Sequence, residues 1–312
     1  KPCKSWVEFS KKEDGKNFYS QLPRKAYASQ DGLCCVDTLH RVTITGLEKN
    51  TTYFYRVLSQ EVKELLPYRP VLGNIVSTDI WEKPLTFTTL DGRQETLSIV
   101  MINDIHGKND LQKKLLEMAP PQNVDMVVFC GDMCNYINKQ SDIFTGFLDT
   151  SVGLFASRKP FVYVRGNHET RGAYARNFFR YLAGPEGKFY YAFTYGPIRF
   201  IVLDSGEDKP DTDVEYSGLV DFDNYILEQK EWLARELESP EFRAASFRVV
   251  LSHIPFGKGS WYGSERLRKQ LLPLLESVRI DLMLSGHNHA FGFMDKGKVT
   301  AFPIIVNSNN SV

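Results

Sequence analysis

After Gly92 the sequence alternates between short apolar runs and longer segments that carry apolar residues at helical spacing. Short runs that are apolar throughout are typical of strands buried on both faces, and strands that alternate with helices form a largely parallel sheet. The predicted strands are Leu97–Ile102, Met126–Cys130, Phe161–Val164, Phe200–Leu203, Val249–Leu251 and Asp281–Leu284. The predicted helices are Leu111–Met118, Asn224–Glu238 and Ser264–Val278. Residues 93–312 are therefore predicted to form an α/β domain.

The sequence before Gly92 has a different hydrophobic pattern, in which apolar and polar residues alternate in Arg41–Thr45, Thr51–Val57 and Leu85–Thr89. This alternation indicates half-buried strands of an all-β domain. The stretch TGLEKNTTYFYRV resembles the E–F corner of fibronectin type III domains, in which a Tyr after the turn bonds back across the corner. Residues 1–92 are predicted to form such a β-sandwich domain, smaller than the second. Fewer strands are predicted than the about seven of a full sandwich, so the domain is expected to be incomplete at its N-terminus.

Composition excludes several classes of partner and site. Lys plus Arg and Asp plus Glu both number 38, which argues against a stable nucleic-acid partner. No apolar run is long enough to span a bilayer. The five cysteines contain no C-x-x-C pair, which disfavours a thiolate metal site, although Cys3 could pair with Cys34 or Cys35. The chain starts at Lys1 without Met or a signal-peptide pattern, so a removed export signal is left open.

Polar residues with metal-binding side chains follow five of the predicted strands. Because the carboxyl ends of parallel strands meet at one crevice, these residues are expected to converge. The candidate ligands are Asp104, His106, Asp132, Asn167, His253, His287 and His289. Five of the six histidines lie in these strand-end motifs, and only His40 lies elsewhere. One stray histidine is usually structural, but five at strand ends indicate a site.

The spacing within these motifs suits a pair of metal ions. Asp104 and His106 are two residues apart, so both can face one cation as the strand ends, and His287 and His289 repeat this spacing. The two oxygens of Asp132 allow it to bridge two metals. Mixed oxygen and nitrogen ligands suit zinc, manganese or iron, and the absence of sulfur disfavours Cu(I).

The motifs Asp-x-His, Gly-Asp, Gly-Asn-His-Glu, a downstream His and Gly-His-x-His, in that order, resemble the calcineurin-like metallophosphoesterases. The resemblance implies two packed sheets flanked by helices and two metal ions. It implies that one ion is held by Asp104, His106, Asp132 and His289. The other would be held by Asp132, Asn167, His253 and His287. His168 would lie beside the metals as the acid that protonates the leaving group.

A β domain followed by such a catalytic domain is similar to purple acid phosphatases, with two departures. That family has Asp-x-Gly where this chain has His106, and a Tyr ligand where this chain has Asn135, with Tyr136 one position late. A His ligand is gained where the Tyr ligand is lost, so metal binding is expected without the tyrosinate–iron colour.

The resemblance predicts a metal-dependent phosphoesterase that hydrolyses a phosphate mono- or diester by attack of a metal-bound hydroxide. The alternatives are a non-catalytic binding scaffold that kept the fold, and an exported protein whose β domain binds carbohydrate or protein. All the ligand positions are filled, which favours the enzyme. Substrate, metal identity and oligomeric state stay open, and the two-domain resemblance favours export to the periplasm or the extracellular space.

Four further interpretations concern residues near these motifs. Glu169 is expected to orient His168 or to cap a helix. Arg165 and Arg171 would contact a substrate phosphate or form ordinary salt bridges. Asp204 also ends a strand and is interpreted as a turn-former. Trp261 and Tyr262 would either wall the substrate pocket or pack under a loop, and the two accounts weigh equally.

Overall fold

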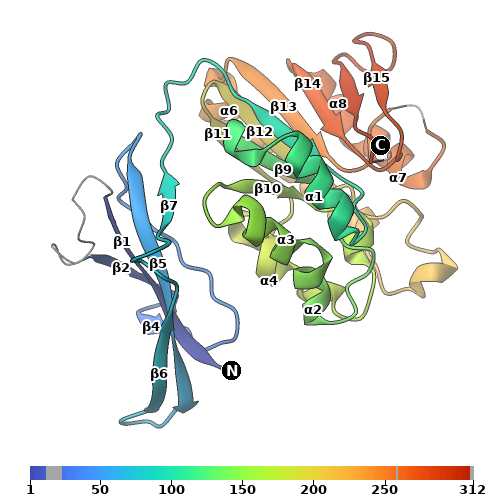
Figure 1. Cartoon of the computed structure of the whole chain (residues 1–312). Coiled ribbons are helices and arrows are strands. Elements are labelled where there is room, and N and C mark those ends of the chain that lie inside the picture. The colour runs from blue at the N-terminus through green and yellow to red at the C-terminus, as the bar shows by residue number, and fades with distance from the viewer. Residues whose placement is uncertain (12–22, 258, 310–312) are drawn as a thin grey trace. The chain divides into compact units, whose positions relative to one another are not determined.

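The computed structural model describes residues 1–11, 23–257 and 259–309. The chain divides into two compact units, Lys1–Gly92 and Arg93–Val312 (Figure 1). Within the described residues the first unit contains strands and no helix, whereas the second combines strands with helices. This confirms the predicted fold class, a β-rich unit followed by an α/β unit.

The first unit contains a five-stranded antiparallel sheet with the long strand β5 (Thr52–Glu64) at its centre. One edge of β5 pairs with β1, and the other edge pairs with β7 near its start and with β6 further along. The remaining strands are β1 (Cys3–Lys11), β2 (Arg24–Tyr27), β6 (Val71–Ser77) and β7 (Leu85–Thr88), with a separate ribbon of β3 (Ser29–Gln30) and β4 (Leu33–Cys34). The predicted strands at Thr51–Val57 and Leu85–Thr89 correspond to β5 and β7.

The predicted tyrosine corner is present in this unit. The hydroxyl of Tyr53 accepts a hydrogen bond from the backbone N–H of Glu48, at 2.9 Å. Tyr53 is buried against Val7 and Phe9, and its ring lies 5.4 Å from the ring of Phe87. The corner therefore ties the turn before β5 to the core of the unit.

The prediction of a strand at Arg41–Thr45 was wrong, because this segment has no strand partner. Val42 and Ile44 still pack against the core, so the alternation of apolar and polar residues correctly indicates which side chains face the core. The carbonyl of Thr45 accepts a hydrogen bond from the guanidinium of Arg24 instead of a ladder bond. Alternation alone does not determine whether a neighbouring backbone is available to pair.

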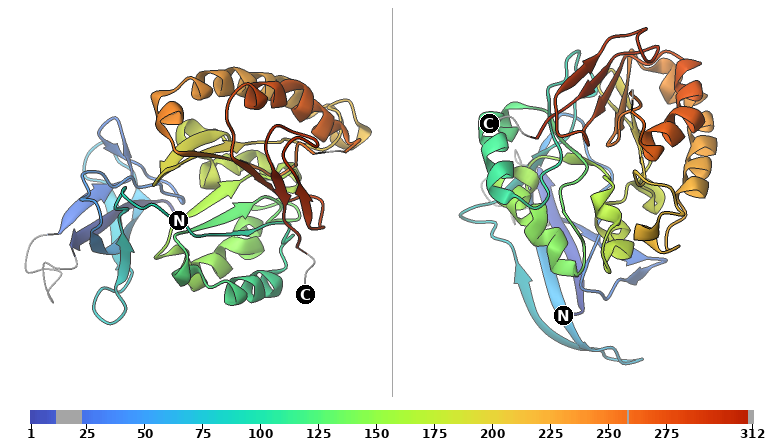
Figure 2. Two further views of the ribbon diagram at one scale, coloured as in Figure 1. Left: turned by 90° about the horizontal axis from the view of Figure 1, so that it is seen from above. Right: turned by 90° about the vertical axis from the view of Figure 1, so that its right-hand side faces the viewer.

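The second unit has four layers, with two sheets packed face to face and helices on both outer faces. In the left view of Figure 2 the orange helices lie on one side of the sheets and the green helices on the other. One sheet is three parallel strands, β8 (Ile99–Ile102), β9 (Met126–Cys130) and β10 (Phe161–Val164). The other has six strands in the order β11 (Tyr191–Tyr195), β12 (Ile198–Leu203), β13 (Phe247–Ser252), β14 (Leu282–Ser285), β16 (Ile304–Val306) and β15 (Gly292–Met294).

Strand β9 shows why these runs are apolar throughout. Val127 and Phe129 face the core between the three-stranded sheet and its helices. Met126, Val128 and Cys130 face the core between the two sheets. Successive side chains point to opposite faces of a strand, so a strand that is buried on both faces needs an apolar residue at every position.

The helices cover the outer faces of the two sheets. Helix α5 (Phe222–Leu237) buries Ile226, Leu233 and Leu237 against the six-stranded sheet, at the helical spacing seen in the sequence. The other α-helices outside the segment 140–156 are α1 (Asn109–Met118), α4 (Phe179–Leu182), α6 (Pro240–Ala244), α7 (Tyr262–Gln270) and α8 (Leu272–Glu276). Short 3₁₀ turns are η2 (Pro121–Asn123), η5 (His168–Thr170), η6 (Ala175–Asn177), η7 (Pro185–Gly187) and η8 (Val214–Tyr216).

Two helical predictions differ from the structure. The helix predicted at Ser264–Val278 is two helices, α7 and α8, since Pro273 has no backbone N–H to continue the helix and stands in the first turn of α8. The sequence prediction also missed a helical stretch that buries Ile143, Phe147 and Phe155. That stretch consists of α2 (Gln140–Ile143), η3 (Phe144–Leu148), α3 (Asp149–Ser151) and η4 (Val152–Ala156), with η3 and η4 wound as wider π turns.

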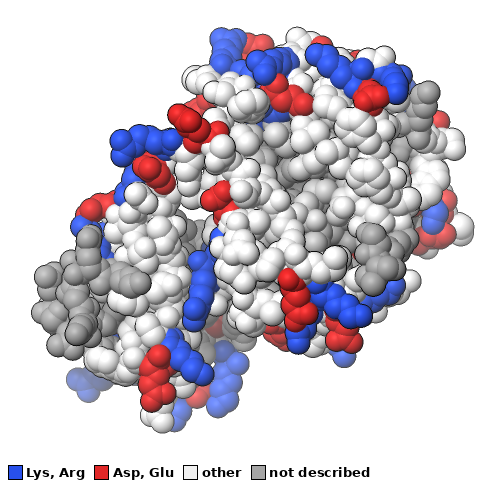
Figure 3. Space-filling view, turned by 45° about the horizontal axis from the view of Figure 1, so that its top comes forward, with Lys and Arg blue, Asp and Glu red and all other residues white. Residues whose placement is uncertain are grey.

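The surface carries charges of both signs. Blue and red side chains lie close together on the face shown in Figure 3, in agreement with the formal charge of zero. In the parts of the chain that the structure describes, no helix combines the length and apolar character needed to cross a bilayer. All five cysteines are unpaired, so the open pairing of Cys3 with Cys34 or Cys35 is not formed in this structure.

Candidate metal centre

The structure brings six of the seven predicted ligand residues, together with His168, to the carboxyl ends of five strands from both sheets of the second unit. Among the described residues, three clusters have ligand atoms within 4.8 Å of one another. The clusters are Asp104–His106–His289, Asp132–His253–His287 and His106–Asp132–His168. Each of the first two clusters contains three ligands expected for one of the two metals. The third cluster contains His106 from the first and Asp132 from the second.

Several ligand atoms face one another without an intervening group. Nε2 of His106 lies 3.1 Å from Nε2 of His289, which in turn lies 3.2 Å from Oδ1 of Asp104. Nε2 of His253 lies 3.2 Å from Oδ2 of Asp132. Two imidazole nitrogens and a carboxylate oxygen that point at one spot form the ligand set of a cation.

The buried atoms that lack hydrogen-bond partners test whether metal ions fit this site. They include Oδ1 of Asp104, Oδ1 of Asn167, Nε2 of His253 and Nε2 of His287. Buried polar atoms almost always have a partner, and leaving one without costs about 1–3 kcal/mol. A metal ion would supply the missing partner for each of these atoms, in the case of His253 once Nε2 has lost its proton, so the donor set fits metal ions.

The backbone at the site is held in an unusual conformation. Five candidate ligands have positive φ angles between 49° and 73°, namely Asp104, His106, Asp132, His287 and His289. Side chains other than glycine rarely adopt this region, and each such residue costs about 1–3 kcal/mol. The surrounding fold therefore supports backbone strain where the ligands need to point inward.

Two glycines allow the loops of the site to approach closely. A Cβ at Gly131 would collide with the ring of His253, and a Cβ at Gly166 would collide with the carboxylate of Asp132. Gly131 also has a φ of +83°, which favours glycine by itself. The glycines of the Gly-Asp and Gly-Asn-His-Glu motifs are thus required by packing against ligand side chains.

Hydrogen bonds and burial set the protonation of the site histidines. Nδ1 of His253 donates to the carbonyl of Cys130 at 2.7 Å, so Nε2 faces the cluster. Burial opposes the charged form of His253, but the carboxylates of Asp132 and Asp104 raise its pKa to about 10. Burial lowers the pKa of His106 to about 4 and that of His287 to about 3. His106 and His287 are therefore neutral and ready to bind metal, whereas His253 must release a proton when metal binds.

Asp132 is ionised at the centre of the clusters. Burial opposes its ionisation, but the positive charge of His253 holds the pKa of Asp132 well below its usual range. Its Oδ1 also accepts the backbone N–H of His168 at 2.9 Å. Asp132 therefore belongs to two clusters, one with His253 and His287 and one with His106 and His168.

His168 lies at the edge of the cluster. Its Nδ1 donates to the carbonyl of Asn135 at 3.0 Å, and its Nε2 accepts a hydrogen bond from Arg171 at 3.1 Å. The ring lies 4.5 Å from that of His106, and Nε2 lies 3.9 Å from Oδ2 of Asp132. His168 is thus close enough to act on a group bound at the cluster.

Glu169 joins two loops of the site rather than orienting His168 or capping a helix. Its buried carboxylate accepts hydrogen bonds from the backbone N–H groups of Asp132, Cys134 and Gly166, each at 2.9 Å. Burial and the nearby charge of Asp132 raise the pKa of Glu169 to about 7. Neither role expected for Glu169 is observed, and its carboxylate instead holds the backbone of two loops.

The two arginines have different surroundings. Arg165 forms a 2.6 Å ion pair with Asp204, and its guanidinium lies 4.4 Å from the ring centre of Phe189. Asp204 also accepts the backbone N–H of Gly206, which confirms its interpretation as a turn-former. Arg171 bonds both oxygens of Glu207 as well as His168. Arg165 is thus part of the protein interior, and Arg171 is the arginine at the site.

Sequence reasoning missed three asparagines that hold the ligand Asp104. The side chain of Asn103 donates to Oδ2 of Asp104 at 2.5 Å, and that of Asn309 donates to its backbone carbonyl at 2.7 Å. Asn307 donates to Oδ1 of Asn103 at 2.7 Å. Asn307 and Asn309 follow β16, so the rule of polar residues after a buried strand would have found them.

Trp261 and Tyr262, whose two possible roles the sequence left equal, have different surroundings. The ring of Trp261 lies 4.7 Å from that of His287, nearly perpendicular at 89°. The hydroxyl of Tyr262 instead donates to Asp223 in α5. Tyr136 is half exposed, with its ring 6.2 Å from that of His168.

Comparisons with known proteins match both units. The calcineurin-like phosphoesterase model matches residues 97–291, and the model of the purple acid phosphatase N-terminal domain matches residues 1–89. Purple acid phosphatases 23 and 22 of Arabidopsis thaliana are each 24% identical to this chain over 92% of its length. The matches cover 63% and 60% of those proteins, so the chain spans about three-fifths of their length.

A solved structure shares part of the fold of this chain. A dimetal phosphatase from Danio rerio superposes with a TM-score of 0.50 and 17% identity, covering 68% of this chain and 87% of its own. At that identity the likeness concerns the fold alone. Because the phosphoesterase match covers more than half of the chain and contains every predicted ligand, this protein belongs to the calcineurin-like phosphoesterase family.

Proposed function

We propose that this protein hydrolyses phosphate mono- or diesters with two metal ions. The observation that carries the proposal is the clustering of candidate ligand atoms at strand ends, several of which are buried without a hydrogen-bond partner. Membership of the phosphoesterase family and the similarity to purple acid phosphatases support the same chemistry.

The two ions would share Asp132. Asp104, His106, Asp132 and His289 would hold one of them, and Asp132, Asn167, His253 and His287 would hold the other. When bound, such a pair supplies Lewis-acid activation of water and neutralises the charge of the phosphoryl oxygens. The chain contributes preorganisation, since strained loops and buried hydrogen bonds already direct the ligand atoms inward.

His168 is proposed to donate the proton that the leaving oxygen needs. Its Nδ1 is engaged by the carbonyl of Asn135, so Nε2 is the ring atom that can deliver a proton. In the structure Nε2 accepts a hydrogen bond from Arg171. This bond must break when Nε2 carries a proton, because Nε2 can then no longer accept. Arg171 would then be free to turn toward a phosphoryl oxygen while Glu207 retains it.

The proposed metals are zinc, manganese or iron, because the ligands are imidazoles, carboxylates and one amide. No tyrosinate colour is expected, since Asn135 stands at the position of the Tyr ligand and Tyr136 is one residue further along the chain. The predicted phosphate-ester substrate, the lack of a nucleic-acid partner and export from the cell stay predictions. The same holds for the fibronectin type III-like character of residues 1–92 and the functional boundary at Gly92.

The test combines metal analysis with kinetics. The purified chain is stripped with a chelator and reconstituted separately with zinc, manganese and Fe(II). Bound metal per chain and hydrolysis of a phosphate monoester and a diester are then measured. Loss of activity on stripping and its return with up to two metal ions per chain are expected.

A matched pair of variants completes the test. Asp132→Asn should abolish metal binding at one or both positions and hydrolysis with it, whereas Asp110→Asn, an exposed aspartate in the first turn of α1, should behave as wild type. A wild-type chain that binds no metal and hydrolyses neither ester would favour the non-catalytic scaffold.

A further inference from the structure

Trp261 presents a large apolar surface directly beside the proposed metal centre. It stands just before the first turn of α7, and 51% of its surface is exposed. Its indole ring packs nearly perpendicular to the ring of His287, which is itself buried and fixed by the fold. The indole is therefore held in place although half of it faces solvent.

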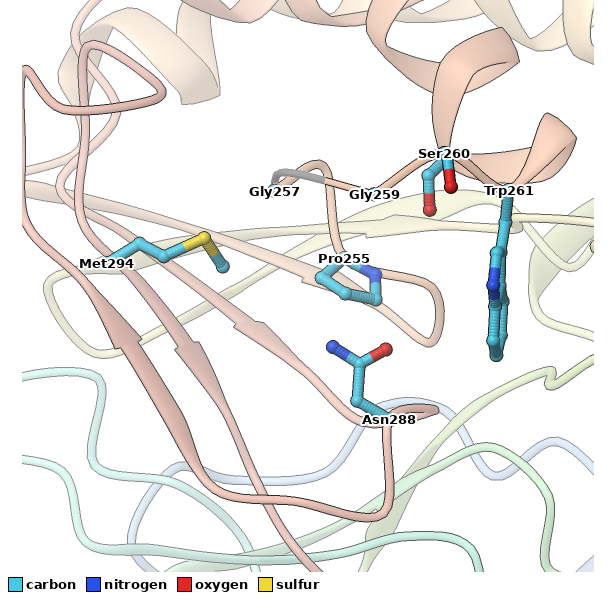
Figure 4. Close-up of a pocket in the computed structure, with 8 residues that line it drawn as sticks. Pro255, Gly257, Gly259, Ser260, Trp261, Asn288 and Met294 are labelled. Carbon is cyan, nitrogen blue, oxygen red and sulfur yellow. The ribbon is translucent and has the colours of Figure 1, made fainter.

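A pocket of about 260 Å³ opens next to this indole. Figure 4 shows the ring of Trp261 on one side of the pocket and Met294 on the opposite side, with Pro255 and the amide of Asn288 between them. Ser260 adds a hydroxyl at the rim beside Trp261. The lining is mainly polar, and the indole of Trp261, the side chain of Met294 and the ring of Pro255 are its apolar parts.

The position of Asn288 ties this pocket to the proposed reaction. Asn288 lies between His287 and His289, which are candidate ligands of different metals. Trp261, which lines the pocket, also contacts the ring of His287, so the pocket adjoins the proposed metal centre. The organic part of a bound ester can extend from the metal centre along Trp261.

We propose that this pocket binds the organic group of the substrate, and that Trp261 selects esters whose organic group carries a flat, apolar ring. The proposal rests on the proposed phosphoesterase function. A cavity of about 150 Å³ is enough to hold benzene, so this pocket has room for one substituted ring. Contacts between aromatic rings contribute about 0.5–1.5 kcal/mol beyond the area they bury. Asn288 can donate and accept hydrogen bonds with polar substituents on that ring.

The experiment compares benzyl phosphate with ethyl phosphate in the metal-loaded enzyme. Both have alkoxide leaving groups, and only the first carries a ring. Trp261→Ala is expected to lower kcat/KM for benzyl phosphate by about three- to tenfold, mainly through KM, with less than a twofold change for ethyl phosphate. Trp261→Phe should recover most of the loss. Trp81→Ala removes an exposed tryptophan from the first unit and serves as the control, with no change for either ester.

Binding of non-hydrolysable analogues separates this proposal from the proposed function. Calorimetry with benzylphosphonate and ethylphosphonate, alongside the metal content of each variant, needs no turnover. Tighter binding of benzylphosphonate that Trp261→Ala removes, at unchanged metal content, supports the pocket even if no ester is hydrolysed. An equal loss for both analogues, or no loss for either, would overturn it. Failure of the wild-type chain to hydrolyse either ester would count against the phosphoesterase function alone.

Discussion

The carboxylate of Glu169 accepts a hydrogen bond from the backbone N–H of Asp132, across 37 residues of sequence. The same carboxylate also accepts the N–H groups of Cys134 and Gly166, so one buried side chain fixes the loops that follow β9 and β10. The loop after β9 carries the proposed bridging ligand, and the loop after β10 carries Asn167. The spacing between these two ligands therefore depends on a residue that is itself no proposed ligand.

Replacing Glu169 with Ala should destabilise the metal-free protein by roughly 3–5 kcal/mol, since three buried N–H groups lose their acceptor. Urea denaturation of the chelator-treated protein measures this loss. Glu117→Ala, at an exposed position of α1, should change the free energy of unfolding by less than about 0.5 kcal/mol. Equal stability of the two variants would mean that the Glu169 contacts contribute nothing.

Replacing Gly166 with Ala should weaken metal binding by about 10–100-fold, the range seen when groups that orient ligands are lost. The reason is steric, because the new methyl group would displace the carboxylate of Asp132. Calorimetric titration of the metal-free protein provides the affinity. Gly153→Ala is the matched control, because a Cβ there meets nothing within 4 Å. Unchanged affinity in Gly166→Ala would show that the loop can move aside.

Replacing Asn309 with Ala should reduce metal affinity about tenfold by releasing the backbone carbonyl of Asp104. The effect should fall on the ion held by Asp104, His106 and His289, so the two binding steps should separate in a metal titration. Asn123→Ala removes an exposed asparagine at the end of η2 and should leave both steps intact. A uniform change in both steps would contradict a local role for Asn309.

Replacing His168 with Ala should leave metal content intact and lower kcat by about 10²–10⁴-fold, with the larger losses on esters that have poor leaving groups. Kinetics on a series of aryl and alkyl phosphates, together with metal analysis, would show this pattern. His40→Ala alters a histidine of the first unit and should have no effect on turnover. Loss of metal in His168→Ala would instead make His168 a ligand, as its distance to the cluster permits.

The ion pair of Glu207 and Arg171 predicts a dependence of stability on pH. Burial raises the pKa of Glu207, but the hydrogen bonds from Arg171 and Thr170 outweigh it and lower that pKa below 4.5. A folded-state pKa below the unfolded value stabilises the protein above the unfolded pKa, and this contribution is lost as pH falls through the folded value. The difference in unfolding free energy between wild type and Glu207→Gln should therefore be constant above about pH 6 and shrink below pH 4.5. A difference that is independent of pH down to pH 3 would refute the linkage.

Most of the α/β unit could be predicted from local patterns. The strands β9 and β10 have the predicted bounds, and β8, β12, β13 and β14 differ only at their ends. Buried strands are recognisable because both faces must be apolar, and that requirement is visible within a few residues. The candidate ligands were identifiable for a related reason, since a polar residue directly after a buried strand has to serve either a turn or a site.

The contacts that support the site could not be predicted in this way. Glu169, Arg165 and Asn309 are all polar residues near strand ends, yet one joins two loops, one pairs with Asp204 inside the protein and one holds Asp104. Trp261 and Tyr262 are neighbours in sequence, but one lines a pocket and the other bonds to α5. Their partners lie on other elements, so no local pattern distinguishes these roles.

The sequence by itself determined which residues end the strands and which of them carry metal-binding atoms. Both properties depend only on the residue types within a short segment of the chain. Only the tertiary structure decided how those atoms face one another, which side chains hold them there and where an organic group can lie beside them. These relationships depend on chain segments as far apart as Asp104 and Asn309, and packing of the two sheets brings them together.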